Sequence, residues 1–323
     1  MTRSICKFGL LALLPALGCG QATAAEALAN FTGPLLTSSA SNLPAGTVAI
    51  EPYLIYNNSR DAYDNHGNRY TKTSGTSQWQ TLVPIFVGIT DRFQMQATVG
   101  AVRSASAGSH SNGFGATDTS VTAQYMLLAP GRDGRDPAVS VNYSHRFPTG
   151  KYDQLDENPL NATGNGASVD TLSLLIQQYI WLANGRPLRW RAVASYSLPP
   201  ARVNVNGLSA YGTPQDFRGY ARLGSSLGIS TSIEYSFNPQ WVFALDLAFN
   251  RASASQVKGV QGLIGTSASF ESRSPSRSVY SLAPAVEYNF NDRIGIVGGV
   301  QFSFAGRNND AFVAPQVAIN MVF

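Results

Sequence analysis

Charged side chains recur at alternate positions in segments whose other face is apolar, and they define the chemistry that this sequence offers. Successive side chains of a β-strand point to opposite sides, so such charges would gather on the face away from the apolar residues. Charges of both signs that line an enclosed interior either pair with one another or set the selectivity of a wet passage. The residues concerned are Glu51, Arg146, Arg189, Arg191, Glu234, Asp246 and Glu287, with Arg146 near the rim.

Apart from these charges, the sequence has few residues for covalent or metal chemistry. Both cysteines, Cys6 and Cys19, precede a predicted signal cleavage site, so the mature chain would hold no thiol for a disulfide, a metal or a nucleophile. His66 lies in a polar segment typical of a solvated turn, which we favour over a metal site, and His110 has no acid nearby. We therefore expect no metal site and no cofactor.

His145 needs a separate argument because it shares its parity with Tyr143 and Phe147 and should point outward. A serine nucleophile needs a base within hydrogen-bond reach. Ser144 cannot serve, because neighbouring strand residues point to opposite faces. No Ser, His and Asn set is evident on one face, so we expect no catalytic residues and no enzyme. A barrel hydrolase acting on lipid remains as the weaker alternative.

Residues 1–25 predict a secretory signal peptide. Basic residues precede a short apolar core at 8–17, and Ala22-Thr23-Ala24 matches a small-residue cleavage pattern. A lipoprotein-type site at Cys19 is the rival interpretation. Cleavage near Ala25 would leave 21 basic and 19 acidic residues, a net charge of +2. That charge is too small to indicate nucleic acid as a partner.

The composition favours a membrane barrel over a soluble domain. Charged residues make up 13% of the 323 residues, about half the share usual in soluble proteins, yet the mean hydropathy is only −0.07. No apolar run reaches the ~20 residues of a membrane helix. Polar positions inside a barrel dilute the lipid-facing ones, and only closed barrels cross a membrane with strands.

Alternating segments separated by turn residues predict an all-β fold, a transmembrane antiparallel β-barrel of about twelve strands spanning residues 47–323. Long and short connections alternate, as in bacterial barrels with long external loops, which would place both termini in the periplasm. Residues 26–46 have no clean period and could be a periplasmic lead-in or a lumen plug. The expected strands are 48–56, 79–89, 93–101, 121–127, 139–147, 169–182, 188–198, 223–237, 241–249, 280–290, 294–304 and 311–323, the sixth with an ambiguous register.

The chain ends on Phe323, directly after an alternating strand. Aromatic residues also cluster at the ends of other segments, where interfacial girdles belong. A soluble β-sandwich or propeller also alternates, but it rarely alternates long and short loops so regularly. A terminal Phe resembles the signal recognised by the outer-membrane assembly machinery, which we expect as a partner together with outer-membrane lipid.

Several segments resemble the MetA-pathway phenol-degradation family of outer-membrane transporters. The similar stretches are Phe31-Thr32-Gly33-Pro34-Leu35, Asn42-Leu43-Pro44-Ala45-Gly46, Glu51-Pro52-Tyr53 and Arg146-Phe147-Pro148-Thr149-Gly150-Lys151-Tyr152-Asp153. The resemblance implies a porin-like transporter for aromatic compounds and supplies no catalytic residues.

We therefore expect an outer-membrane channel for passive uptake of small-molecule solutes, aromatic or hydrophobic compounds among them, lined by the charges named above. The alternative to a channel or a hydrolase is a structural or surface-interaction barrel whose long loops bind a partner.

Overall fold

The computed structural model describes residues 29–131, 134–262 and 267–323. The predicted signal peptide at 1–25, including Cys6 and Cys19, lies outside these residues and stays a prediction. Over the described ranges, no helix is both long and apolar enough to cross a membrane.

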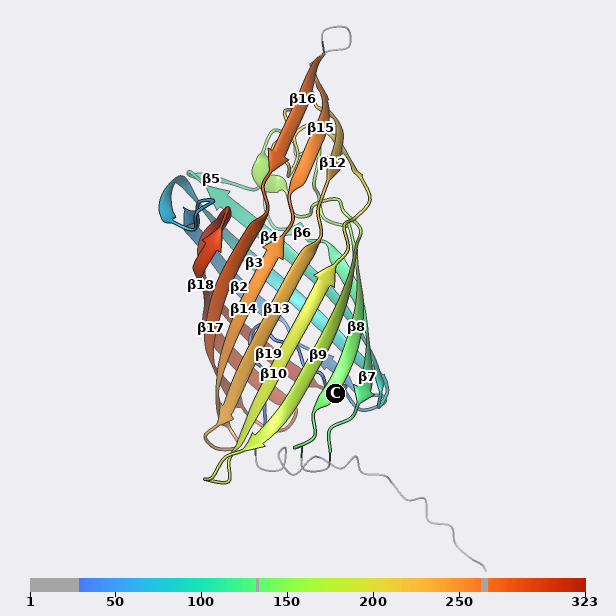
Figure 1. Cartoon of the computed structure of the whole chain (residues 1–323), viewed down its shortest axis with the longest axis vertical. Coiled ribbons are helices and arrows are strands. Elements are labelled where there is room, and N and C mark those ends of the chain that lie inside the picture. The colour runs from blue at the N-terminus through green and yellow to red at the C-terminus, as the bar shows by residue number, and fades with distance from the viewer. Residues whose placement is uncertain (1–28, 132–133, 263–266) are drawn as a thin grey trace, which may run out of the picture.

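Twelve long strands form a closed antiparallel barrel in the described part of the chain (Figure 1). The strands are β2 (Tyr53–Tyr63), β3 (Arg69–Thr90), β4 (Phe93–Ser106), β7 (Thr119–Leu128), β8 (Ala138–Phe147), β9 (Val169–Trp181), β10 (Pro187–Ser197), β13 (Ser226–Ser236), β14 (Trp241–Ala252), β17 (Arg277–Asn289), β18 (Ile294–Arg307) and β19 (Asn309–Val322). Each strand pairs with its neighbours in this order, and β19 closes the ring on β2, with Val317 opposite Leu54. The predicted barrel is confirmed.

A short strand, β1 (Val48–Ile50), continues β2 past a break at Glu51 and Pro52. It pairs with β3 on one side and β19 on the other, the same neighbours that β2 has. Pro52 has no backbone N–H to donate to a ladder, which accounts for the interruption. The backbones of Val48 and Phe323 then exchange hydrogen bonds of 3.2 and 2.8 Å, so the last residue is held in the sheet.

The outward face of the barrel is apolar and the inward face is built mainly from small or polar residues. Strand β9, whose register the sequence left ambiguous, shows the division: Leu172 and Leu174 are 56% and 45% exposed, whereas Leu175 is 1% exposed. Outward-facing leucines at this exposure are unfavourable in water and suited to lipid. Strand β9 therefore places its even-numbered residues outward.

Aromatic pairs mark both ends of this apolar band. Trp241 meets Tyr288 edge to face at 4.7 Å between ring centroids near the short turns, and Phe249 lies tilted against Tyr280 at 4.6 Å near the long connections. Rings at these levels match the interfacial girdles of membrane barrels.

The hairpin of β2 and β3 is longer than the sequence predicted. The polar stretch 58–75 was expected to be a loop, but β2 runs to Tyr63 and β3 starts at Arg69. Outside the membrane both faces of a hairpin are wet, so apolar alternation is lost while the backbone ladder continues. Asp64 organises the turn by accepting from the amides of His66 and Asn68, and the side chain of Asn68 helps to lower the pKa of Asp64.

The expected loops at 201–222 and 251–275 are also partly wrong. They form a four-stranded sheet in the described residues, made of β11 (Val203–Asn206), β12 (Arg218–Arg222), β15 (Ser255–Gln261) and β16 (Ala268–Ser274). This sheet stands beyond the barrel at the end opposite the C-terminus (Figure 1). Its core is centred on Val205 and Phe217 and includes Ala167 from another connection. The sheet therefore depends on packing between distant parts of the chain, which a local sequence pattern does not reveal.

A charge on the outward face should destabilise the barrel if that face contacts lipid. We expect Leu247→Arg, between the two girdles of β14, to lower the free energy of unfolding by about 2–4 kcal/mol in bilayers. Tyr70→Arg, on the hairpin beyond the barrel, is the matched control and should change it little. Guanidinium titration in phospholipid vesicles measures both, and equal effects would contradict a lipid-facing belt at Leu247.

Candidate functional site

Residues 29–46, called here the inner segment, run along the inside of the barrel wall (Figure 1). Seven of the eight neighbouring strands from β17 to β4 each direct an inward polar side chain at this segment, the exception being β13. The wall residues are Glu287 on β17, Asp246 on β14, Arg191 on β10, Gln177 on β9, Ser140 on β8, Gln124 on β7 and Gln94 on β4. The segment thus follows the circumference of the wall instead of its axis.

Carboxylates hold the first half of the inner segment. The Gly33 amide donates to Glu287 Oε2 at 3.1 Å. Asp246 accepts from the amides of Leu36 and Thr37 at 3.3 and 3.0 Å and from the Thr37 hydroxyl at 2.7 Å. These bonds satisfy backbone donors that an irregular segment in a lumen would otherwise leave unpaired.

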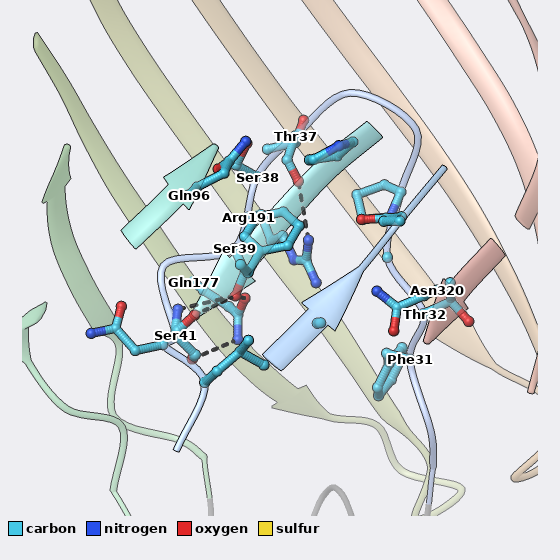
Figure 2. A pocket seen from close by; sticks show the side chains of 18 of the residues that line it. Phe31, Thr32, Thr37, Ser38, Ser39, Ser41, Gln96, Gln177, Arg191 and Asn320 are labelled. Atoms are coloured by element: carbon cyan, nitrogen blue, oxygen red, sulfur yellow. Dashed lines mark hydrogen bonds between the residues drawn. The ribbon is translucent and has the colours of Figure 1, made fainter. Parts of the chain in front are cut away.

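Side-chain amides hold the second half. Gln177 bonds the hydroxyls of Ser39 and Ser41 at 3.0 and 3.1 Å, as Figure 2 shows. Gln94 Oε1 accepts from the Leu43 amide at 2.8 Å. Gly88 then permits the segment to reach the wall, because a Cβ there would lie 2.2 Å from the carbonyl oxygen of Pro44. An amide has both a donor and an acceptor, so it can bond a backbone without burying a charge.

A buried ion cluster lies beside the inner segment. Arg189 Nε donates to Glu234 at 2.7 Å, Arg191 Nε lies 3.3 Å from the same carboxylate, and the Glu234 side chain has no exposed surface. Arg191 also donates to the Thr37 carbonyl at 3.1 Å (Figure 2). The Arg189 guanidinium lies over the Phe31 ring at 4.4 Å, which joins the cluster to the segment.

Six of the predicted inward charges therefore lie around one region of the lumen, and one does not. Glu51 accepts from the Tyr53 hydroxyl at 3.0 Å and lines the same cavity as Arg189 and Arg191. Arg146 lies apart, toward the long connections, with its side chain 39% exposed and 3.9 Å from Asp118. The sequence analysis did not single out the amides of Gln94, Gln124 and Gln177. Their alternation with apolar residues near short turns did indicate that these side chains point inward.

A cavity of about 360 Å³ lies between the inner segment and the wall. Apolar side chains of Phe31, Leu35 and Leu43 share its lining with hydroxyl and amide groups, including Ser39 and Gln96 (Figure 2). Leu35 packs on the small wall residues Ala244, Ala283, Ala285, Val297 and Ala318. Small wall residues thus leave the room that the segment and the cavity occupy.

The connection at 148–168 folds over the long-loop end of the barrel. Asp118 accepts from the amides of Gly150 and Asn165 at 3.0 and 3.4 Å. The hydroxyl of Tyr211 donates to the carbonyl of Asn165, and burial raises the pKa of Tyr211 well above its usual range. This end of the barrel is therefore bordered by loops that bond to one another.

The sequence showed no Ser, His and Asn set on one face, but in the structure His145 does have polar partners on its own face. Its side chain contacts Ser168 and Asp170, which also point outward. Ser168 lies just past the expected loop and just before the expected sixth strand, where parity was ambiguous. Strand pairing of β8 with β9 brings the three together.

No protein-family model matches the chain, and no curated protein matches it in sequence. An outer-membrane channel from Pseudomonas putida F1 aligns with a TM-score of 0.64 at 14% identity, over 88% of this chain and 98% of that chain. The transport unit of the autotransporter AIDA-I from Escherichia coli aligns with a TM-score of 0.44 at 10% identity, over 91% and 94%. The Pseudomonas putida toluene transporter TodX aligns with a TM-score of 0.35 at 11% identity, over 86% and 90%.

The first similarity shows the fold of this chain and, at 14% identity, only the fold. The other two TM-scores are below 0.5, so those two proteins do not bear on how this chain works. Together with the apolar outward belt, the shared fold shows that the chain is a transmembrane β-barrel of the outer-membrane type.

The ion cluster should contribute to stability through pairing that a neutral substitution breaks. We expect Glu234→Gln to lower the free energy of unfolding by about 3–5 kcal/mol, because two buried guanidiniums would lose their shared carboxylate. Glu271→Gln, at an exposed ion pair with Arg273, serves as the control and should have little effect. Guanidinium titration of both variants in vesicles measures this, and equal stabilities would contradict it.

Proposed function

We propose that this barrel is a passive uptake channel for small, neutral, partly apolar compounds, and that the inner segment is a lumen plug that restricts passage. The cavity between the inner segment and the wall is the observation that carries the proposal. Its volume of about 360 Å³ falls in the range of small-molecule sites. Transport would be diffusion through a shaped lumen, with no covalent step in the lumen.

The charges around the cavity favour neutral solutes over anions. Glu51, Arg189 and Arg191 line the cavity, and the carboxylates of Glu234, Asp246 and Glu287 lie beside it around the ion cluster and the inner segment. Both guanidiniums already contact Glu234, so neither is left to attract a carboxylate solute. The phenyl ring of Phe31 beside hydroxyl and amide groups suits a compound with an apolar body and one or two polar groups.

Two further features support the proposal. The sequence segments that resemble the MetA-pathway phenol-degradation family suggest membership in that family and phenol-like compounds as solutes. One solved structure with this fold is an outer-membrane channel. In this proposal the short turns and both termini face the periplasm, and the four-stranded sheet faces the outside. The named charges would line the passage, and Arg146 would lie at its outer mouth.

Removing the plug should open the channel. We expect deletion of residues 29–43 to raise single-channel conductance several-fold in a planar bilayer, because the segment occupies the lumen. Asp246→Ala is a milder change that removes three bonds to the segment and should increase the frequency of open steps.

Asp310→Ala, at an exposed ion pair far from the segment, is the matched control and should behave as wild type. Phenol should reduce the current through the open variants more than benzoate does. Conductance that is unchanged in both plug variants would exclude a plug, and stronger block by benzoate would exclude selection for neutral solutes.

Phe323 should matter for assembly more than for stability. Phe323 is 68% exposed, while its backbone is bonded to Val48. We expect Phe323→Ala to lower the amount of barrel inserted in the outer membrane several-fold, because the assembly machinery would lose its signal. Phe304→Ala, at another exposed aromatic, is the control. Heat-modifiable mobility on gels reports insertion, and equal insertion of the two variants would refute a signal at Phe323.

A further inference from the structure

A Ser–His–Asp set lies on the outward face of the barrel, outside the lumen. It consists of Ser168, His145 and Asp170, called here the outer triad, at the long-loop ends of β8 and β9. His145 Nε2 lies 2.9 Å from the Ser168 hydroxyl, and His145 Nδ1 lies 2.7 Å from Asp170 Oδ1. These distances match the nucleophile–base and base–orienter contacts of a catalytic triad.

The carboxylate of Asp170 determines the roles of the two ring nitrogens. An ionised carboxylate only accepts hydrogen bonds, so Nδ1 of His145 carries the proton that faces Asp170. Nε2 is then left as the acceptor for the Ser168 hydroxyl. The Tyr143 hydroxyl donates to the same Asp170 oxygen at 2.6 Å, which holds the carboxylate in place. The imidazole is thus oriented as a base toward Ser168.

The surrounding strands fix the outer triad in position. His145 and Asp170 are directly opposite each other in the β8–β9 ladder. Ala167 and Val169, on either side of Ser168, are buried in the core of the four-stranded sheet, so Ser168 is forced to the exposed side. The His145 ring also meets Phe147 edge to face at 4.5 Å. A site held by strand pairing and packing is preorganised.

The neighbours of the outer triad indicate the substrate. Leu172 and Leu198 flank it on the outward face at 56% and 44% exposure, and Tyr196 lies opposite Leu172 in the ladder. The outer triad therefore has the lipid-facing belt on one side and the polar loops on the other. A molecule with an acyl chain in the membrane and its ester group at the interface would place the ester carbonyl near Ser168.

We propose that the outer triad is a hydrolytic site for carboxylic esters of acyl chains at the outer surface of the membrane. Ser168 Oγ bonds to the carbonyl carbon, and its proton moves to His145 Nε2. The carbon–oxygen bond to the alcohol then breaks, and the alcohol oxygen takes that proton. Water attacks the acyl-serine and gives a proton to Nε2. Cleavage of the Ser168 ester releases the acid and returns the proton to Oγ.

Covalent labelling tests the site directly and does not depend on transport through the lumen. The refolded mature protein in micelles is treated with a fluorophosphonate probe, and the modified residue is located by mass spectrometry. We expect label on Ser168 in the wild type and none in Ser168→Ala. A structural hydrogen-bond cluster would leave the wild type unlabelled, which would overturn the proposal.

Hydrolysis provides the second measurement. We expect the wild type to cleave p-nitrophenyl octanoate in micelles and to release fatty acid from phosphatidylcholine vesicles. His145→Gln and Asp170→Asn should each slow cleavage by about 100-fold or more. Ser144→Ala, on the adjacent but inward-facing residue, is the matched control and should retain the wild-type rate.

Folding of every variant is checked by heat-modifiable mobility and circular dichroism. Absence of ester cleavage by folded wild type, or cleavage that persists in folded Ser168→Ala, would overturn the assignment. Conductance should stay at the wild-type value in Ser168→Ala, because the outer triad and the lumen lie on opposite faces of the barrel wall. This result would show that ester cleavage and transport are separate activities.

Discussion

Backbone N–H and C=O groups that face lipid must find partners within the protein, and this requirement determines most of the structure. The barrel meets it by pairing its first long strand with its last, so no edge faces the membrane. The break at Glu51 and Pro52 is tolerated because β1 resumes the same pairings immediately. Phe323 completes this closure through its backbone bonds to Val48.

The same requirement applies inside the lumen, where the inner segment lacks a ladder of its own. The wall supplies the missing partners as side chains: Asp246 for the amides of Leu36 and Thr37, Ser140 for the carbonyl of Ala40, and Gln94 for the amide of Leu43. Charged and amide groups at inward positions therefore have a structural role before any role in selecting solutes. Since that role engages both arginines of the ion cluster, the cavity beside them is left without a free positive charge.

The outward face shows how the two ends of the strands differ. Between the girdles the face is apolar, as lipid demands. At the long-loop end of β8 and β9, polar side chains reappear on that face and satisfy one another, with Asp170 accepting from both Tyr143 and His145. Beyond the membrane water replaces lipid as the neighbour. The hairpin of β2 and β3 therefore continues with mostly polar residues, and the four-stranded sheet buries one face around Val205 and Phe217.

The sequence by itself determined the strands and the face on which most of their side chains lie. That information is local, because a two-residue period identifies both a strand and its apolar side. It therefore identified the inward charges, including Glu234 and Arg189, and the outward direction of His145. The glutamines that bond the inner segment alternate in the same way as the inward charges. Alternation alone therefore did not distinguish them from other residues that face the lumen.

Only the tertiary structure decided which of these residues meet. Glu234 faces Arg189 because the β10–β13 register places them opposite each other, and His145 faces Asp170 because of the β8–β9 register. The path of the inner segment and the sheet built from 201–222 and 251–275 depend on contacts between distant parts of the chain. Closure and register arise from strand pairing over long sequence separations. The local alternation of apolar and polar residues does not determine which strands pair or in which register.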